Sequence, residues 1–177
     1  MGKMFLMCGL SGAGKTTFAK KFAEENGYDY LAIDDVYKCW NYRYDDLEDS
    51  FQAWMKFFQA IHCAECHKHD VVIDTNAPTF VKRAQFIDWF PTFDEHNLIY
   101  IEADRDLRRR NNLARDRVVP DDEMRRMEGE FEPPLYTDGE YAWWTDENWW
   151  SDEYYWDHTR FFLNENNILR EIPICDN

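Results

Sequence analysis

Apolar residues recur along the chain in short runs, separated by longer stretches in which they return every three or four positions. Four runs are short and continuous, which predicts buried strands at 3–7, 28–33, 71–74 and 97–103. A further run at 166–173 predicts a last strand. Phe18 and Phe22 lie four residues apart, which is typical of an amphipathic helix.

The stretches between the runs have helical periodicity. They predict helices at 15–25, 49–66, 80–90, 104–117 and 120–131. The last of these has Pro120 at its expected first position and acidic residues in its first turn. Strands that alternate with helices predict an α/β fold with a parallel sheet covered on both faces. We expect residues 1–177 to form one domain. The sequence has no run of 18 apolar residues, so it predicts no membrane span.

The first predicted strand leads into the sequence CGLSGAGKTT, Cys8–Thr17. It fits the pattern G-x-x-x-x-G-K-[ST] through Gly9, Gly14, Lys15 and Thr16. In such a loop the backbone N–H groups face phosphate oxygens, the lysine reaches the β- and γ-phosphates, and the hydroxyl binds Mg²⁺. A helix that starts there also directs its positive end at the phosphates. Because strand, loop and helix occur together, we interpret the loop as an ATP site and not as a chance glycine turn.

Charge narrows the range of partners. The chain has 35 acidic and 20 basic residues, which argues against a broad grip on duplex DNA. Six arginines lie within 104–117, whereas 127–159 contains no lysine or arginine. The five cysteines suggest no disulfide framework, and the loop begins too early for a signal peptide to precede it. We therefore expect a reducing, cytoplasmic location.

Acidic residues follow the second and third predicted strands. Asp34 and Asp35 end the second strand, where one could orient an acceptor hydroxyl and take its proton, or could instead cap a helix. Asp74 follows three buried residues, as an acid near Mg²⁺ does, although it could also be a turn former. The arginines of 104–117 could close over a nucleotide as a lid (about 104–131) and stabilise its transferring phosphoryl group, or remain a solvated basic face.

Four motifs together resemble a known kinase group. These are GLSGAGKT, DDVYK, VIDTNAP followed by KR, and RNNLARDRVVPDDEMRRM. The set resembles the P-loop kinases of the phage-type polynucleotide 5′-hydroxyl kinase group, to which seryl-tRNA kinases and zeta-toxin-like kinases are related. The resemblance covers about Met4 to Pro134. It implies a P-loop kinase-like three-layer sandwich with an arginine-bearing helical lid, and ATP and Mg²⁺ as cofactors.

The resemblance also assigns roles to residues. Asp35 matches the general base of a D-x-x-R motif, and Lys38 stands where the group has an arginine that holds the acceptor phosphate. A lysine binds phosphate as a point charge and lacks the bidentate fork. Arg115 best matches the catalytic lid arginine. The residues expected to bind the nucleotide are Gly9, Ser11, Gly12, Ala13, Gly14, Lys15, Thr16, Thr17, Arg110 and Arg117. Those expected to bind the acceptor are Asp34, Lys38, Asp74, Asn76 and Arg83, with Thr16 and Asp74 as Mg²⁺ ligands.

Two segments fall outside this match. Residues 132–160 are acidic and rich in aromatic residues, including five tryptophans. Aromatic rings could stack bases of a single strand, but the acids would repel a phosphate backbone, so we expect a packed cap or a protein or self-association surface. Cys63, Cys66 and His67 share one helix face, which permits zinc. Without a second ligand pair, we expect buried thiols instead.

The sequence thus predicts an ATP-dependent kinase with an alcohol acceptor. The first hypothesis for the acceptor is the 5′-hydroxyl end of RNA or DNA. The second is a small hydroxyl compound such as a nucleoside, sugar or antibiotic. A nucleotide-dependent binding module without phosphotransfer is a third hypothesis, which the acceptor-side pair Asp35 and Lys38 disfavours.

Overall fold

The computed structural model describes residues 2–115, 117–134 and 156–172. Within them the strands are β1 Lys3–Cys8, β2 Asp29–Ala32, β3 Val71–Asp74, β4 Glu95–Ala103, β5 His158–Glu165 and β6 Ile168–Ile172. The helices are α1 Lys15–Asn26, α2 Ile33–Trp40, α3 Leu47–His67, α4 Phe80–Trp89, α5 Arg105–Leu113 and α6 Asp121–Glu130. Each of these helices is too short or too polar to cross a membrane.

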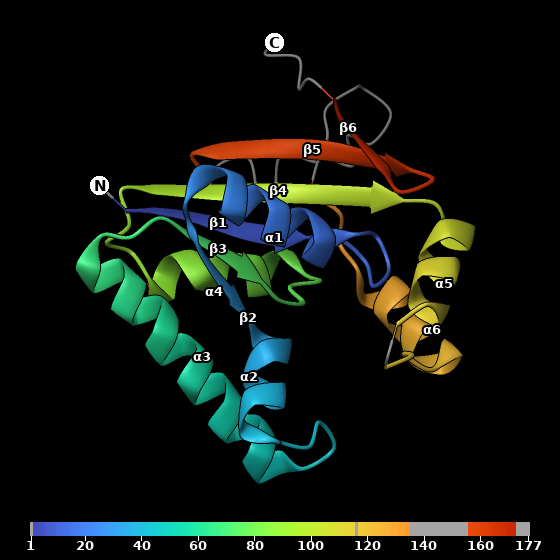
Figure 1. Ribbon diagram of the computed structural model, residues 1–177, viewed down its shortest axis with the longest axis horizontal. Coiled ribbons are helices and arrows are strands. Elements are labelled where there is room, and N and C mark those ends of the chain that lie inside the picture. The colour runs from blue at the N-terminus through green and yellow to red at the C-terminus, as the bar shows by residue number, and fades with distance from the viewer. Residues whose placement is uncertain (1, 116, 135–155, 173–177) are drawn as a thin grey trace, which may run out of the picture.

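The strands form one sheet in the order β2-β3-β1-β4-β5-β6 (Figure 1). The first five strands in this order run parallel, and β6 pairs antiparallel with β5. Strand β1 lies at the centre, where Leu6 is in register with Ile73 of β3 and Leu98 of β4. This mostly parallel α/β sheet confirms the expected fold class.

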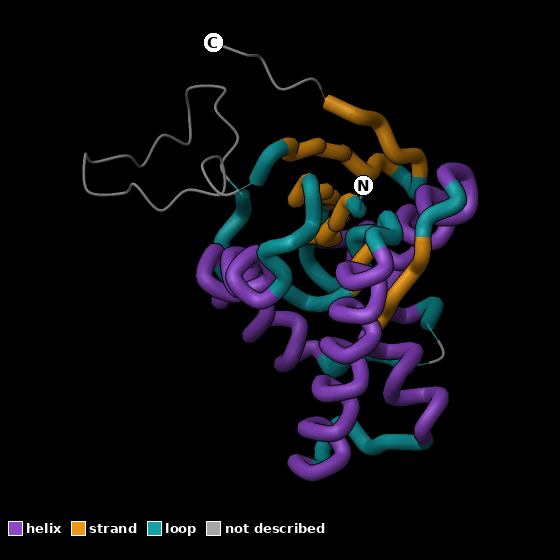
Figure 2. The backbone as a smooth tube through the Cα atoms, turned by 90° about the vertical axis from the view of Figure 1, so that its left-hand side faces the viewer, coloured by secondary structure: helices purple, strands orange, loops and turns teal. Residues whose placement is uncertain are grey.

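Alternate residues of β1 enter two separate cores. Met4 and Leu6 pack on the face that α2, α3 and α4 cover, and Phe5 and Met7 pack on the face that α1 covers. A parallel sheet buried on both faces accounts for the continuous apolar runs in the sequence. Figure 2 shows that α3, the longest of the described helices, extends away from the sheet, and Figure 1 shows α2 beside its far end.

Helix α3 illustrates how local sequence sets an element. The Asp46 side chain accepts a hydrogen bond from the backbone N–H of Asp49 at 3.0 Å, which caps the first turn. Ala53, Phe57 and Ile61 then recur at four-residue spacing and are fully buried against the sheet. Truncation of a buried phenylalanine such as Phe57 costs about 3–5 kcal/mol, so this stripe anchors the helix.

Several predicted boundaries differ from the structure. Ile33 begins α2 and does not end the second strand, so 28–33 was too long. The arginine helix ends at Leu113, which leaves Arg115 and Arg117 beyond it. Pro120 is the N-cap of α6 and not its first residue. Strand β5 was not predicted, because its start falls within the segment assigned to the aromatic cap.

Candidate functional site

The glycine loop lies at the carboxyl end of β1 and packs tightly against neighbouring backbone. Gly9 has φ 136° and Gly12 has φ 82°, both in the region that favours glycine. A Cβ added at Gly12 would lie 2.2 Å from the carbonyl oxygen of Arg108, and one at Gly9 would lie 2.3 Å from that of Ile101. Both positions therefore exclude any side chain, and the loop is pressed against β4 and α5.

Lys15 opens α1 and folds back onto the loop. Its Nζ donates to the carbonyl oxygens of Gly9 at 2.7 Å and Leu10 at 3.1 Å. Burial within the loop lowers the pKa of Lys15, and the nearby carboxylate of Asp74 acts in the opposite direction. Thr16 and Thr17 follow at the exposed start of the helix, where their hydroxyl groups are open to a ligand.

Helix α2 brings two carboxylates to the same edge of the sheet. Asp34 and Asp35 are exposed in its first turn, and Lys38 is exposed in its last. The N-cap is Ala32 with no side-chain hydrogen bond, so neither aspartate is a cap and that interpretation was wrong. The helix starts one residue before the pair, which leaves both carboxylates near its positive end.

Asp74 is the last residue of β3 and is buried. Its Oδ2 accepts a hydrogen bond from the hydroxyl of Tyr30 on β2 at 3.0 Å. Burial and the charge of Asp74 raise the pKa of Tyr30, so the phenol keeps its proton and holds the carboxylate in place. The next residue, Thr75, is buried with its Oγ1 unpaired, and Asn76 is exposed.

Three of the six arginines join α5 to α6. Arg108 is buried, and it donates to the carbonyl oxygen of Ala103 at 3.1 Å and to Glu128 at 2.8 Å. Arg109 forms an ion pair with Asp121 at 2.6 Å, and Arg105 lies 3.7 Å from Glu128. These arginines stabilise the helix pair, which Figure 1 shows beyond the arrowhead of β4.

The other three arginines point elsewhere. Arg115 donates from Nη1 to the Ser11 hydroxyl of the loop at 3.2 Å. The Arg117 guanidinium lies 3.4 Å from the centre of the Tyr44 ring. Arg110 donates to Asn166 in the turn between β5 and β6 at 3.5 Å. Of the predicted lid arginines, Arg115 thus contacts the loop. Arg117 is linked to α2 through Tyr44, whose hydroxyl donates to Asp34 at 3.3 Å.

Two asparagines that sequence reasoning missed brace the loop. Asn111 of α5 donates to the carbonyl oxygen of Gly12 at 2.8 Å, and Asn164 of β5 donates to that of Ala13 at 2.7 Å. The Asn164 Oδ1 is buried and unpaired. Asn111 lies within the quoted RNNLAR motif, which was a usable signal, whereas no local pattern marks Asn164.

Arg83 is fully buried on α4 and so differs from the exposed residues of the acceptor group. It donates to the carbonyl oxygens of Ala77 and Pro78 at 3.3 and 3.2 Å. Those carbonyls belong to the segment that follows Asp74 and Asn76. Arg83 therefore stabilises the conformation of that segment from the interior of the protein.

The cysteine and histidine residues near the end of α3 depart from the expectation. Cys63 and Cys66 are exposed, so the expectation of buried thiols was wrong. The helix turns its small residue Ala64 and not its thiols toward the core. In residues 2–115, 117–134 and 156–172, no three His, Cys, Asp or Glu side chains converge as a metal cluster. The tryptophans of 135–155 lie outside the described residues, and only Trp156 of the five is seen, buried in the core.

The glycine loop between β1 and α1, at the carboxyl edge of a parallel sheet and beside an arginine-bearing helix pair, defines a P-loop protein of the kinase-like type. The chain belongs to the AAA_33 family, described as an AAA domain, whose sequence profile matches residues 4–134. None of the curated proteins compared with the chain matches it.

Solved structures of similar fold include several kinases. A sugar kinase from Janibacter sp. HTCC2649 superposes with a TM-score of 0.58 at 16% identity, over 78% of this chain and 82% of that one. A putative kinase from Chloroflexus aurantiacus gives 0.59 at 13% identity, over 75% and 78%. A chain of the Pnkp1/Rnl/Hen1 RNA repair complex gives 0.66 at 13% identity, over 73% of this chain and 43% of that one. At these identities the likeness concerns the fold alone.

Proposed function

We propose that the protein transfers the γ-phosphate of ATP to a hydroxyl group. The observation that carries this proposal is the convergence of charged groups around the loop lysine. Asp34, Asp74 and Arg115 come from three different segments, and all lie close enough to Lys15 to act on its pKa. Phosphoryl transfer needs such a mixture of cations and carboxylates, because charge must be balanced while a hydroxyl is deprotonated.

Each group has a role in this mechanism. Lys15 leaves the carbonyls of Gly9 and Leu10 and binds the phosphates of ATP. The Thr16 hydroxyl and the Asp74 carboxylate are oxygen donors of the kind that Mg²⁺ prefers, and they would hold the ion that neutralises phosphate charge. Asp35 takes the proton of the acceptor hydroxyl. Arg115, with Arg110 and Arg117, stabilises the transferring phosphoryl group.

For the acceptor we favour the 5′-hydroxyl end of RNA or DNA. Tyr44 lies beside α2, the helix that carries Asp34, Asp35 and Lys38, and its hydroxyl donates a hydrogen bond to Asp34. One face of its ring stacks on Tyr37 at 4.0 Å, and the Arg117 guanidinium lies against the ring. A planar cation over an aromatic ring occupies a position that a nucleobase could take, since bases stack on such rings without regard to sequence. Lys38 and Asn76 would bind the acceptor, and Arg83 would support it through the loop after β3.

A small hydroxyl compound is the second candidate. Acidic residues surround the acceptor helix, and Arg43, which could bind a phosphate, is instead paired with Asp46 and Asp49. A polynucleotide backbone would find few free cations there, whereas a neutral sugar would not be repelled. The same site thus fits a compound such as a nucleoside or sugar if the acceptor has no phosphate.

We propose further that residues 1–177 act as one domain. Strands β5 and β6, which follow the aromatic segment, belong to the same sheet as β1 to β4. A role for 132–160 in association with a protein or a second copy remains a hypothesis, since 135–155 lie outside the described residues.

Transfer of radiolabel from γ-labelled ATP tests the proposal. The acceptors are 5′-hydroxyl oligonucleotides, tRNA, nucleosides and sugars, each offered with Mg²⁺. We expect label on oligonucleotide 5′ ends. Label on a nucleoside or sugar alone would move the assignment to the second candidate. No label on any acceptor, with tight ATP binding, would favour a binding module.

Lys15→Ala should reduce this transfer by at least about 10²-fold, because the ammonium is the loop's own cation for the phosphates. Lys21→Ala is the matched control, since Lys21 is an exposed lysine of the same helix, paired with Glu25 at 3.7 Å. The control should keep full activity, and both variants should melt near the wild-type temperature. Undiminished transfer by Lys15→Ala would contradict the assignment of the loop.

A further inference from the structure

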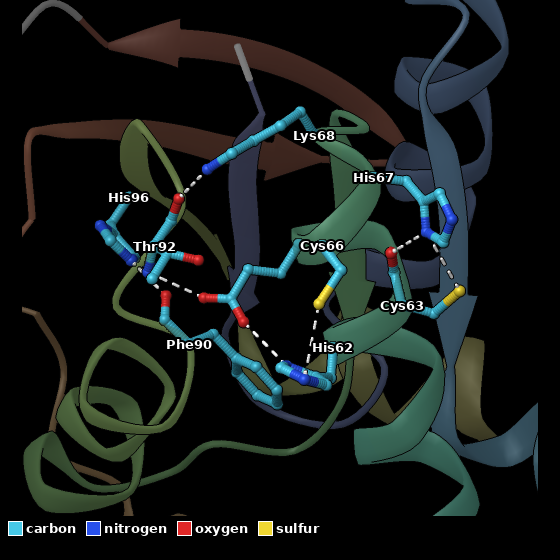
Figure 3. A network of polar contacts seen from close by, with 9 residues as sticks. His62, Cys63, Cys66, His67, Lys68, Phe90, Thr92 and His96 are labelled. Carbon is cyan, nitrogen blue, oxygen red and sulfur yellow. Dashed lines mark hydrogen bonds and ion pairs between the residues drawn. The ribbon is translucent and has the colours of Figure 1, made fainter.

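The last two turns of α3 contain two interleaved cysteine–histidine pairs (Figure 3). Cys66 Sγ lies 3.5 Å from His62 Nε2, and Cys63 Sγ lies 3.6 Å from His67 Nδ1. All four side chains are exposed, and in each pair the two residues are four positions apart. The helix end immediately precedes β3, so the pairs lie at the opposite end of that strand from Asp74 and the glycine loop.

The pair of Cys66 and His62 is backed by a buried carboxylate. His62 Nδ1 lies 3.0 Å from Glu65 Oε2, and the Glu65 side chain is only 3% exposed. The other oxygen, Oε1, accepts the backbone N–H of Thr92 at 2.8 Å, while Lys68 donates to the Thr92 carbonyl oxygen at 2.6 Å. Glu65 is thereby fixed in orientation from the side opposite His62.

This geometry places the His62 ring between a carboxylate and a thiol. A carboxylate oxygen only accepts hydrogen bonds, so His62 Nδ1 is the donor to Glu65 and Nε2 faces the Cys66 thiol. An imidazolium formed at this position would be stabilised, because the helix dipole is negative at the last turns of a helix. An imidazole held between a carboxylate and a thiol can accept the thiol proton at Nε2 while its Nδ1–H donates to the carboxylate.

The second pair lacks this support. His67 Nδ1 lies 2.8 Å from the carbonyl oxygen of its own partner residue, Cys63, so that nitrogen donates to the backbone. It therefore cannot also accept the Cys63 thiol proton. The chain thus offers two cysteines one turn apart, with a histidine beside each, and only Cys66 has a histidine with a free acceptor and a carboxylate behind it.

We infer that Cys66, His62 and Glu65 form a reactive-thiol site that undergoes exchange with small disulfides such as oxidised glutathione. The Cys66 proton moves to His62 Nε2, and the thiolate attacks one sulfur of the disulfide. A bond forms between Cys66 Sγ and that sulfur, and the disulfide bond of the small molecule breaks. The departing sulfur leaves as a thiolate and takes the proton from His62, so the products are a mixed disulfide and one free thiol. The site does not depend on the proposed kinase activity.

The test is the rate at which each cysteine of the full-length protein reacts with oxidised glutathione or with an aromatic disulfide reagent, measured by peptide mass mapping. We expect Cys66 to react about tenfold faster than Cys63 or the exposed Cys39, since the thiolate is the nucleophile. His62→Gln should bring Cys66 down to the rate of Cys63. His67→Gln, the matched control, should change neither rate.

Unfolding in urea gives a second control, because the three rates should converge once the helix is lost. Glu65→Gln should slow Cys66 as His62→Gln does. If it impairs folding, His62→Gln still decides, because the His62 side chain is exposed. Equal rates for Cys66 and Cys63 in the folded protein, or an unchanged Cys66 rate in His62→Gln, would overturn the proposal.

Discussion

Asp34 and Asp35 are neighbours in the first turn of α2, yet their surroundings differ. Asp34 accepts a hydrogen bond from Tyr44, the residue on which the Arg117 guanidinium lies. Asp35 is exposed. A general base must be free to receive a proton from the acceptor, and a carboxylate already engaged with a phenol is less suited to that role. The environments of the two residues therefore support Asp35 as the base and Asp34 as a residue that binds the acceptor.

Asp35→Asn should lower kcat by about 10²-fold or more while ATP affinity stays nearly unchanged, because the change removes a base and no nucleotide contact. Asp34→Asn is the comparison and should act mainly on the acceptor KM. Steady-state kinetics with both substrates varied separates the two effects. If Asp34→Asn is the variant that loses turnover, the two roles are exchanged.

Tyr30 acts on the site through Asp74. Tyr30→Phe removes the hydrogen bond to Asp74 Oδ2 but keeps the ring in β2, so the carboxylate loses its fixed orientation. We expect the Mg²⁺ concentration needed for half-maximal transfer to rise by about 10-fold, with little change in melting temperature. A Mg²⁺ titration of initial rates measures this. An unchanged Mg²⁺ requirement would mean that Asp74 does not bind the ion or does not need Tyr30.

At the scale of elements, the helix pair α5 and α6 is joined by a partly buried ion pair. The Arg108 side chain is 10% exposed and is held by Glu128 and by the Ala103 carbonyl. Arg126, in contrast, is an exposed residue of α6 whose partners Glu123 and Glu130 lie on the same helix. The two arginines offer a comparison between a contact that joins two helices and one that decorates a single helix.

Arg108→Ala should lower the free energy of unfolding by about 1–3 kcal/mol, because it removes the donor of the Ala103 carbonyl and leaves Glu128 with Arg105, at 3.7 Å, as its remaining partner among the described residues. Arg126→Ala should change it little, since exposed ion pairs contribute weakly. Urea unfolding followed by circular dichroism measures both. Similar small losses for the two variants would mean that the Arg108–Glu128 pair does not hold α6 in place.

The sequence predicted the elements whose signal is local. The strand 71–74 and the helices near 15–25 and 80–90 agree with β3, α1 and α4 to within a residue, because their apolar runs are bounded by polar residues or by glycine and proline. Helix α2 was missed because the apolar run of β2 continues into its first residue, Ile33. Strand β5 was missed because its first residues lie within the acidic aromatic segment 132–160, which was assigned to a cap.

The same distinction applies within the site. The glycine loop and Asp74 could be predicted, since each follows directly from a motif. Which arginines face the loop and which join the two helices could not be predicted. Arg108 and Arg109 pair with acidic residues of α6, and no sequence pattern indicates those pairs. Asn164 was out of reach as well, since 151 residues separate it from its partner Ala13.

For the whole molecule, the net charge of −15 limits how a polynucleotide could bind. The structure reduces the available cations further, because Arg83 is buried and Arg43 is paired with acids. Lys38, Lys82 and the lid arginines Arg115 and Arg117 are exposed. A polynucleotide would therefore make only a few phosphate contacts, all near its end.

This charge distribution predicts a shallow salt dependence. Each phosphate contact contributes somewhat less than one unit, so the slope of log K against log salt should be about −1 to −3. A 5′-hydroxyl trinucleotide and a 20-mer should give similar kcat/KM values across a salt series. A steep slope with a strong preference for the longer acceptor would contradict a short footprint.

The hydrogen bond from Asn164 to the glycine loop has a consequence for the unit that folds. The family profile ends at residue 134, but Asn164 and the strand that carries it lie beyond that point. The stretch that the family profile covers is therefore shorter than the stretch that contacts the loop. A fragment that ends at residue 134 would contain every motif residue and still lack β5 and β6 at one edge of its sheet. The region that defines the family is therefore smaller than the region that must fold together.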